Sequence, residues 1–154
     1  MRWVPAATLA ALMGEALRQR GVPEEHAAYV SDGLLEASLR GIDTHGVRLF
    51  PTYIAELDGG RGRARPDLQW SGERAVRGLD AGGALGLVAG RIAADEAARL
   101  AREFGVGAVS VGNSNHFGAA SVYTLAMARQ GVLGLSLTNS DALVAPHGGV
   151  RPAF

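Results

Sequence analysis

The sequence predicts an α/β fold of the mixed α+β kind, in which N-terminal helices are followed by part of a mixed sheet with helices. Three observations predict it. Apolar residues with helical spacing fill about the first 60 positions, two short apolar runs follow that each end at polar residues, and glycines separate the segments. A hydrophobic fraction of 47% is sufficient for a folded core.

Three helices are expected in the first part of the chain. The first ends before Gly21, and the second begins at Pro23, whose fixed φ suits a first helical turn. The second helix runs to about Leu39 and stops at Gly41, and the third ends at Gly59-Gly60. The apolar positions that indicate the first and third helices are Leu9, Leu12, Met13 and Leu17, and then Val47, Phe50, Ile54 and Leu57.

Strands and helices are expected to alternate in the second part. After a polar loop, the expected elements are strand-like pieces at 68–70 and 75–80, a glycine-rich turn at 81–86, a helix to about residue 104, a buried strand at 106–111, a helix at 119–130 and a second buried strand at 133–138. Two buried strands leave open edges, which points to further sequence or to a partner subunit that completes the sheet.

Charge and composition exclude several classes of protein. The 154-residue chain has 15 Lys and Arg residues and 15 Asp and Glu residues, so no basic excess is available for a nucleic acid. The absence of cysteine excludes disulfides, zinc–thiolate sites and a cysteine nucleophile. Because the start of the chain does not form a signal peptide and segment 6–17 is too short to span a bilayer, we expect a cytoplasmic protein with no membrane partner.

The first candidate site is the segment Arg40-Gly41-Ile42-Asp43-Thr44-His45-Gly46-Val47-Arg48. His45 and Arg48 stand three residues apart at the expected start of a helix, where they would share one side of the first turn. Arg48 suits a carboxylate, His45 suits proton exchange with the adjacent oxygen, and Thr44 could orient the ring. In the alternative interpretation, a residue at 43 or 44 caps the helix and the other side chains are ordinary surface residues.

The second and third candidate sites follow the two buried strands. In Gly112-Asn113-Ser114-Asn115-His116-Phe117-Gly118, His116 could carry a proton or contact a cofactor, or it could simply satisfy a backbone carbonyl. Thr138-Asn139-Ser140, followed by Ala145-Pro146-His147-Gly148-Gly149, could bind a ribose, a phosphate or a carboxamide, or it could form a turn.

Two other kinds of site are disfavoured. The run Gly82-Gly83-Ala84-Leu85-Gly86 lacks the Gly-x-Gly-x-x-Gly spacing, and the acidic residue about 20 positions on, Glu103, falls at a helix end, so a structural turn is favoured over a Rossmann loop. A metal hydrolase is disfavoured because the histidines lack metal-binding spacing; they are His26, His45, His116 and His147.

Together these segments resemble the type-2 malate/L-lactate dehydrogenase family, whose members include ureidoglycolate, sulfolactate and diketogulonate dehydrogenases and piperideine-carboxylate reductases. The resemblance spans nearly the whole chain in three separated motifs. The residues that carry it are 39–48, Tyr53, Gly59-Gly60, 111–118, Tyr123, 138–140 and 144–149.

The resemblance implies a sulfolactate dehydrogenase-like fold that is not a Rossmann fold, NAD or NADP as the cofactor, and a homodimer. It implies a helical segment at 1–60 that carries the His/Arg substrate motif, and the first part of the NAD(P)-binding mixed-sheet domain at 61–154. Family members are roughly twice as long, so the chain is expected to be a fragment or a truncated product that exposes apolar surface and self-associates.

The resemblance also implies residue roles. His45 would donate or accept the proton, Arg48 would anchor the substrate carboxylate, and Thr44 would supply the hydroxyl for which the family commonly has serine. The side chains expected beside the nicotinamide or in contact with the cofactor are His116, Phe117, Gly118, Asn139 and Ser140. The expected reaction is hydride transfer between NAD(P) and C2 of a small 2-hydroxy or 2-oxo acid, and the alternative is a catalytically silent chain that acts as an assembly or folding module.

Overall fold

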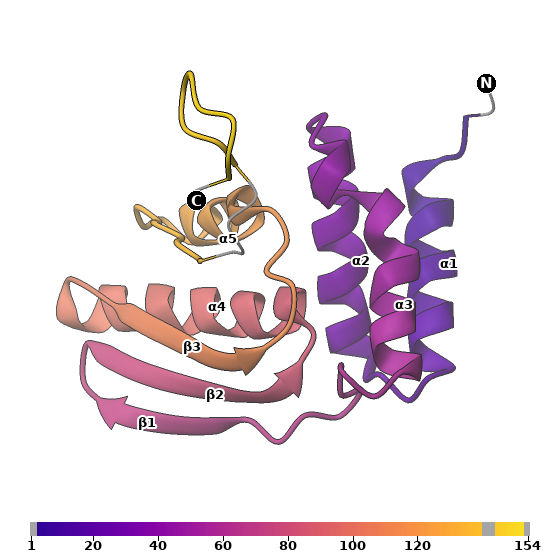
Figure 1. The fold of residues 1–154 in the computed structure, drawn as a ribbon. Coiled ribbons are helices and arrows are strands. Elements are labelled where there is room, and N and C mark those ends of the chain that lie inside the picture. Colours follow the sequence, from indigo (N-terminus) through magenta and orange to yellow (C-terminus); the bar gives the residue numbers. More distant parts are fainter. Residues whose placement is uncertain (1–2, 140–143, 153–154) are drawn as a thin grey trace.

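The computed structural model describes residues 3–139 and 144–152. Its N-terminal helices stand side by side next to a small sheet (Figure 1). They are α1 (Ala6–Arg18), α2 (Glu24–Leu39) and α3 (Phe50–Asp58). The predicted helix ends at Gly21 and Gly41 are confirmed, since both glycines have the positive φ that ends a helix readily. No helix in the described part of the chain is long and apolar enough to cross a membrane.

The sheet is mixed, as predicted. Its strands lie in the order β1-β2-β3, with β1 antiparallel to β2 and β2 parallel to β3. Helix α4 makes the crossover between the parallel strands and lies along one face of the sheet, and α5 packs on α4 (Figure 1). The bounds are β1 Gln69–Glu73, β2 Val76–Ala84, α4 Gly86–Phe104, β3 Ala108–Ser114 and α5 Ala120–Arg129.

One hydrophobic core joins the N-terminal helices to the rest of the chain. Leu17 and Leu34, from α1 and α2, belong to the same buried cluster as Leu87 of α4 and Val122 of α5. Because α2 packs directly against α4 and α5, the segment that carries His45 is held in a fixed position relative to the loop that carries His116.

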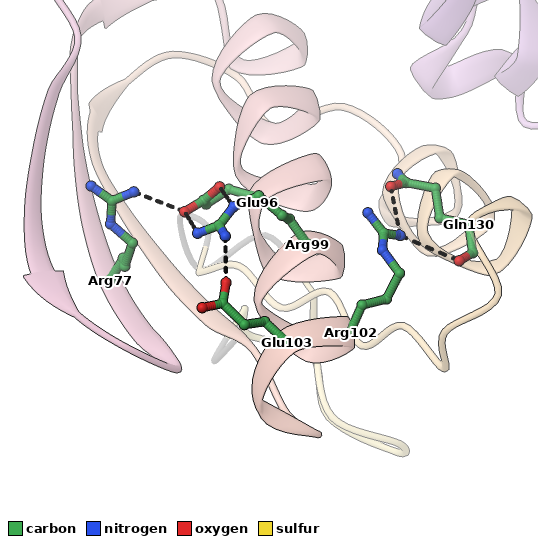
Figure 2. Close-up of polar contacts among 6 residues, drawn as sticks. All are labelled: Arg77, Glu96, Arg99, Arg102, Glu103 and Gln130. Atoms are coloured by element: carbon green, nitrogen blue, oxygen red, sulfur yellow. Dashed lines mark hydrogen bonds and ion pairs between the residues drawn. The ribbon is translucent and has the colours of Figure 1, made fainter.

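An ion pair joins α4 to the sheet, and further ion pairs within α4 adjoin it. Arg77 of β2 donates to Glu96 of α4 at 2.8 Å, and Arg99 donates to both Glu96 and Glu103 (Figure 2). The Glu96 side chain is only 14% exposed. Its pKa falls to about 2 because Arg99, and then Arg77, donate hydrogen bonds to the carboxylate, against the opposing effect of burial. A charged Glu96 therefore stabilises the contact between helix and sheet.

The expected strand at 133–138 is not present in the described structure. This segment runs without a backbone partner, and Leu133, Leu135 and Leu137 are 102%, 79% and 79% exposed. The alternation of leucine with small residues is the period of a strand, but a strand forms only when a neighbour accepts its backbone hydrogen bonds. The prediction failed because no such neighbour lies beside the segment among the described residues.

The buried strand before the second motif is also displaced from its expected position. The expected range is 106–111, yet β3 spans Ala108–Ser114, so Gly112 and Ser114 pair with β2 instead of forming a loop, while Asn113 lies unpaired at a shift in register. Most of β3 is exposed, so the expectation of a buried strand is wrong among the described residues, whereas the expected exposure of apolar surface is seen at Val106 and Val111.

Candidate active site

The predicted first turn around His45 takes a different form. Two short 3-10 turns, Asp43–His45 and Val47–Leu49, precede α3, which begins only at Phe50. Gly46 separates them in an extended conformation, and a Cβ atom there would lie 2.1 Å from Ser38 Oγ. The expectation that His45 and Arg48 share the first turn of a helix is therefore wrong. The extended residue Gly46, which packs closely on α2, separates the turn that holds His45 from the turn that holds Arg48.

The structure brings the first and second motifs together. The rings of His45 and His116 stack with their centroids 5.5 Å apart and their planes 19° apart. Thr44 Oγ1 lies 3.0 Å from His45 Nδ1, within hydrogen-bond distance. A hydroxyl and two imidazoles from distant segments thus form one cluster of groups that can hold and move protons.

The buried residue Tyr53 of α3 contacts the His116 ring. Its hydroxyl lies 2.9 Å from His116 Nδ1 and donates to the main-chain oxygen of His116 at 3.4 Å. Tyr53 is 1% exposed. Burial raises the pKa of its phenol well above the ordinary value, so the hydroxyl keeps its proton.

The charge on His116 depends on its neighbours. Burial of the ring lowers the pKa of His116, the nearby His45 lowers it further, and Glu56 acts in the opposite direction. Glu56 lies one turn after Tyr53 on α3 and is 9% exposed. Its Oε2 atom has no hydrogen-bond partner among the described residues.

The loop around His116 is fixed by its backbone. Tyr123 of α5 donates to the main-chain oxygen of Phe117, and its ring packs against the Phe117 ring with centroids 4.7 Å apart. Gly118 has a φ of +78° and lies against Leu87. Phe117 and Gly118 thus hold the loop in place, and the Phe117 ring is already packed within the protein.

The glycine-rich run at the junction of β2 and α4 also supports this loop. A Cβ atom at residue 86 would lie 2.0 Å from the His116 main-chain oxygen, and one at residue 82 would lie 2.3 Å from that of Asp67. Asn115 Nδ2 lies 3.1 Å from the main-chain oxygens of Gly83 and Ala84. Protein backbone therefore fills the space around this run, so its role is structural. The expectation of a turn at 81–86 is nevertheless wrong, because residues 82–84 end β2 and Gly86 begins α4.

The other candidate residues make no hydrogen bond with this cluster among the described residues, or they lie outside the described residues. Arg48 is exposed in the second 3-10 turn and makes no hydrogen bond or ion pair within the described ranges. Asn139 is exposed at the end of the unpaired segment, where its main-chain oxygen accepts from Thr138. Ser140 lies outside the described residues.

Sequence reasoning missed Tyr53 and Glu56 as parts of the site. Tyr53 belongs only to the residues that carry the family resemblance, and none of the candidate motifs includes Glu56. A signal was present, since two polar-tipped residues three apart fall on the same side of α3, where both are buried. Two such side chains on a buried helix face usually face a polar partner.

Comparison with known proteins agrees with the family that the sequence resembles. This chain belongs to the malate/L-lactate dehydrogenase family, whose model matches residues 4–154. It is 39% identical over 149 residues to the malate dehydrogenase of Pyrococcus abyssi, an alignment that covers 96% of this chain and 41% of the relative. It is 37% identical to the L-sulfolactate dehydrogenase of Methanocaldococcus jannaschii, covering 90% of this chain and 40% of that protein.

The solved structures agree with the fold. The malate dehydrogenase from Pyrococcus horikoshii OT3 superposes with a TM-score of 0.91 at 37% identity, over 97% of this chain and 43% of that one. The chain thus spans about two fifths of the length of the relatives it matches. The predicted family and the mixed, non-Rossmann fold are both confirmed.

Proposed function

We propose that this chain forms part of the active site of a dehydrogenase that transfers a hydride between NAD or NADP and C2 of a small 2-hydroxy or 2-oxo acid. The observation that carries the proposal is the stacked pair of His45 and His116 with the Thr44 hydroxyl beside it. Oxidation of an alcohol requires a base for the hydroxyl proton, and this cluster supplies imidazole and hydroxyl groups for that task. Membership of a dehydrogenase family supports the same chemistry.

Each residue has a distinct part in this proposal. His45 exchanges the proton of the substrate oxygen, and Thr44 orients its ring through Nδ1. Arg48 binds the substrate carboxylate, for which its exposed and unpaired guanidinium among the described residues is suited. His116 lies against His45 and can share or relay the proton.

The cofactor would lie beside His116. When bound, the nicotinamide supplies or accepts the hydride. The flat imidazole of His116 suits stacking with a planar ring, and Asn139 offers an exposed amide for polar contacts. Phe117 and Gly118 contribute by holding the loop, and Ser140 is proposed from the resemblance alone. We further propose that the enzyme acts as a homodimer.

The test joins this chain to the remainder of a relative. Residues 1–154 replace the matching segment of the malate dehydrogenase of Pyrococcus abyssi, and reduction of NAD and NADP is followed with malate, lactate and sulfolactate. We expect turnover in the chimera and its loss in the His45→Ala variant, with cofactor titration of the chain alone as a comparison. A folded chimera without turnover for any of these acids would contradict the proposal.

A further inference from the structure

The Tyr53 hydroxyl stands between two atoms of a single residue. It contacts His116 Nδ1 at 2.9 Å and the His116 main-chain oxygen at 3.4 Å. A phenol has one proton to donate and can also accept a hydrogen bond. Because Tyr53 is buried and keeps its proton, both roles are available at the same time.

Only one tautomer of His116 uses both contacts. If Nδ1 carries the proton, it donates to the tyrosine oxygen, and the tyrosine proton then goes to the main-chain oxygen. If Nδ1 is bare, the tyrosine proton must go to Nδ1, and the main-chain oxygen loses its contact. A part-buried acceptor left without a donor costs free energy, so the first arrangement is preferred.

A buried acid stands behind this pair. Glu56 follows Tyr53 by one helical turn, and its Oε2 has no partner within the part of the chain that the structure describes. The titratable groups that act on His116 are His45 from the first 3-10 turn and Glu56 from α3, while Tyr53 and Tyr123 stay neutral. Glu56 acts to raise the pKa of His116, so a negative charge on this carboxyl group favours the imidazolium form of the ring.

We propose that Tyr53 and Glu56 are positioning residues for His116: Tyr53 holds its ring in the Nδ1–H form with Nε2 free to accept a proton, and Glu56 stabilises the imidazolium that results. The direction of the proton transfer rests on the proposed function. The tautomer does not, because it follows from contacts within this chain, and neither does the effect of Glu56, which acts on His116 through its charge.

Protons balance in this arrangement. Proton uptake breaks one O–H bond in the substrate, or one N–H bond in His45, and forms one N–H bond at His116 Nε2. The Nδ1–H bond and the tyrosine O–H bond stay intact, so no other group has to turn. Release of the proton reverses the same step.

The first test is nitrogen NMR of the histidine rings in the 154-residue chain, with signals assigned by His45→Ala and His116→Ala variants. We expect His116 in the Nδ1–H form in the wild type and a shift toward the Nε2–H form in Tyr53→Phe, which keeps the ring and removes the hydroxyl. The matched control is Tyr29→Phe, since Tyr29 donates to Glu25 on α2 away from His116. An Nε2–H form in the wild type, or no shift in a folded Tyr53→Phe variant, would overturn the role of Tyr53.

The second test is titration of His116 by the same signals. Glu56→Gln should lower the pKa of His116 and leave the tautomer unchanged, since the carboxylate acts through its charge. An unchanged or higher pKa would overturn the role of Glu56.

In the chimera, Tyr53→Phe should lower kcat about 10- to 100-fold with little change in KM, because the loss is one of orientation. An inactive wild-type chimera with the expected NMR results would count against the proposed function alone.

Discussion

The imidazole rings of His45 and His116 stack with their centroids 5.5 Å apart, although they come from a 3-10 turn near the helices and from the loop after β3. Two imidazoles this close share an electrostatic environment, so a proton on one opposes a proton on the other. The pair is therefore suited to hold one proton at a time.

The first prediction concerns His45 as the acid–base residue. His45→Ala should lower kcat of the chimera by about 100-fold or more, the usual contribution of general acid–base help. Steady-state kinetics with the preferred acid measure this. Leu39→Ala, an exposed position at the end of α2, is the matched control and should leave kcat unchanged. Wild-type turnover in His45→Ala would remove His45 from the mechanism.

The second prediction concerns Arg48 as the carboxylate anchor. Arg48→Ala should raise KM for the acid about 10-fold or more with a smaller effect on kcat, because a charged contact to the substrate is lost. Arg48→Lys should raise KM for the acid less than Arg48→Ala does, but should not restore the wild-type KM, since an ammonium lacks the paired donors of a guanidinium. The same KM in all three proteins would show that Arg48 does not touch the substrate.

The third prediction concerns stability in mild acid. The pKa of His116 in the folded chain lies below its ordinary value, so the unfolded chain binds more protons in this range and stability rises with pH. Stability should therefore fall as the pH drops from neutrality through the unfolded value of about 6.5 toward the lower folded value. Thermal unfolding across this range should show the loss in the wild type and a smaller loss in His116→Gln. Equal slopes in the two proteins would contradict it.

The fourth prediction concerns the ion pairs between α4 and the sheet. Glu96→Gln should destabilise the chain by about 1–2 kcal/mol, because Arg77 and Arg99 lose a charged acceptor. Since the folded pKa of Glu96 is about 2, its contribution is complete above its ordinary value of 4.5 and is lost as the pH falls through about 2. Denaturant unfolding measures the change. The exposed Glu103→Gln is the control, and an equal effect there would show that burial of Glu96 is unimportant.

The fifth prediction concerns the exposed leucines of the unpaired segment. Leu133, Leu135 and Leu137 are exposed apolar side chains on a segment without a backbone partner, which favours association with a second chain. The chain should self-associate at high concentration, and replacement of all three by serine should reduce this in analytical ultracentrifugation. A wild-type chain that stays monomeric at every concentration would contradict the expectation.

The sequence was informative where periodicity and glycines decide the structure. It predicted the helices, the mixed sheet and the family, and it selected His45 and His116 from among the histidines. It could not show that Gly46 interrupts the helix start, because that depends on Ser38 of α2. It also missed Glu56, whose burial arises only when α3 packs on its neighbours. The failed strand at 133–138 has the same origin, since pairing is a property of the neighbour as much as of the segment.

The main-chain oxygen of His116 accepts a hydrogen bond from Tyr53, and that of Phe117 accepts one from Tyr123. The side chain of Asn115 donates to the main-chain oxygen of Gly83 just before α4. A loop tied at successive residues has little conformational freedom left to lose. Ligand binding next to it should therefore carry a small entropic penalty, and the Asn115 amide proton, which is donated to the Ala84 main-chain oxygen, should exchange slowly with solvent.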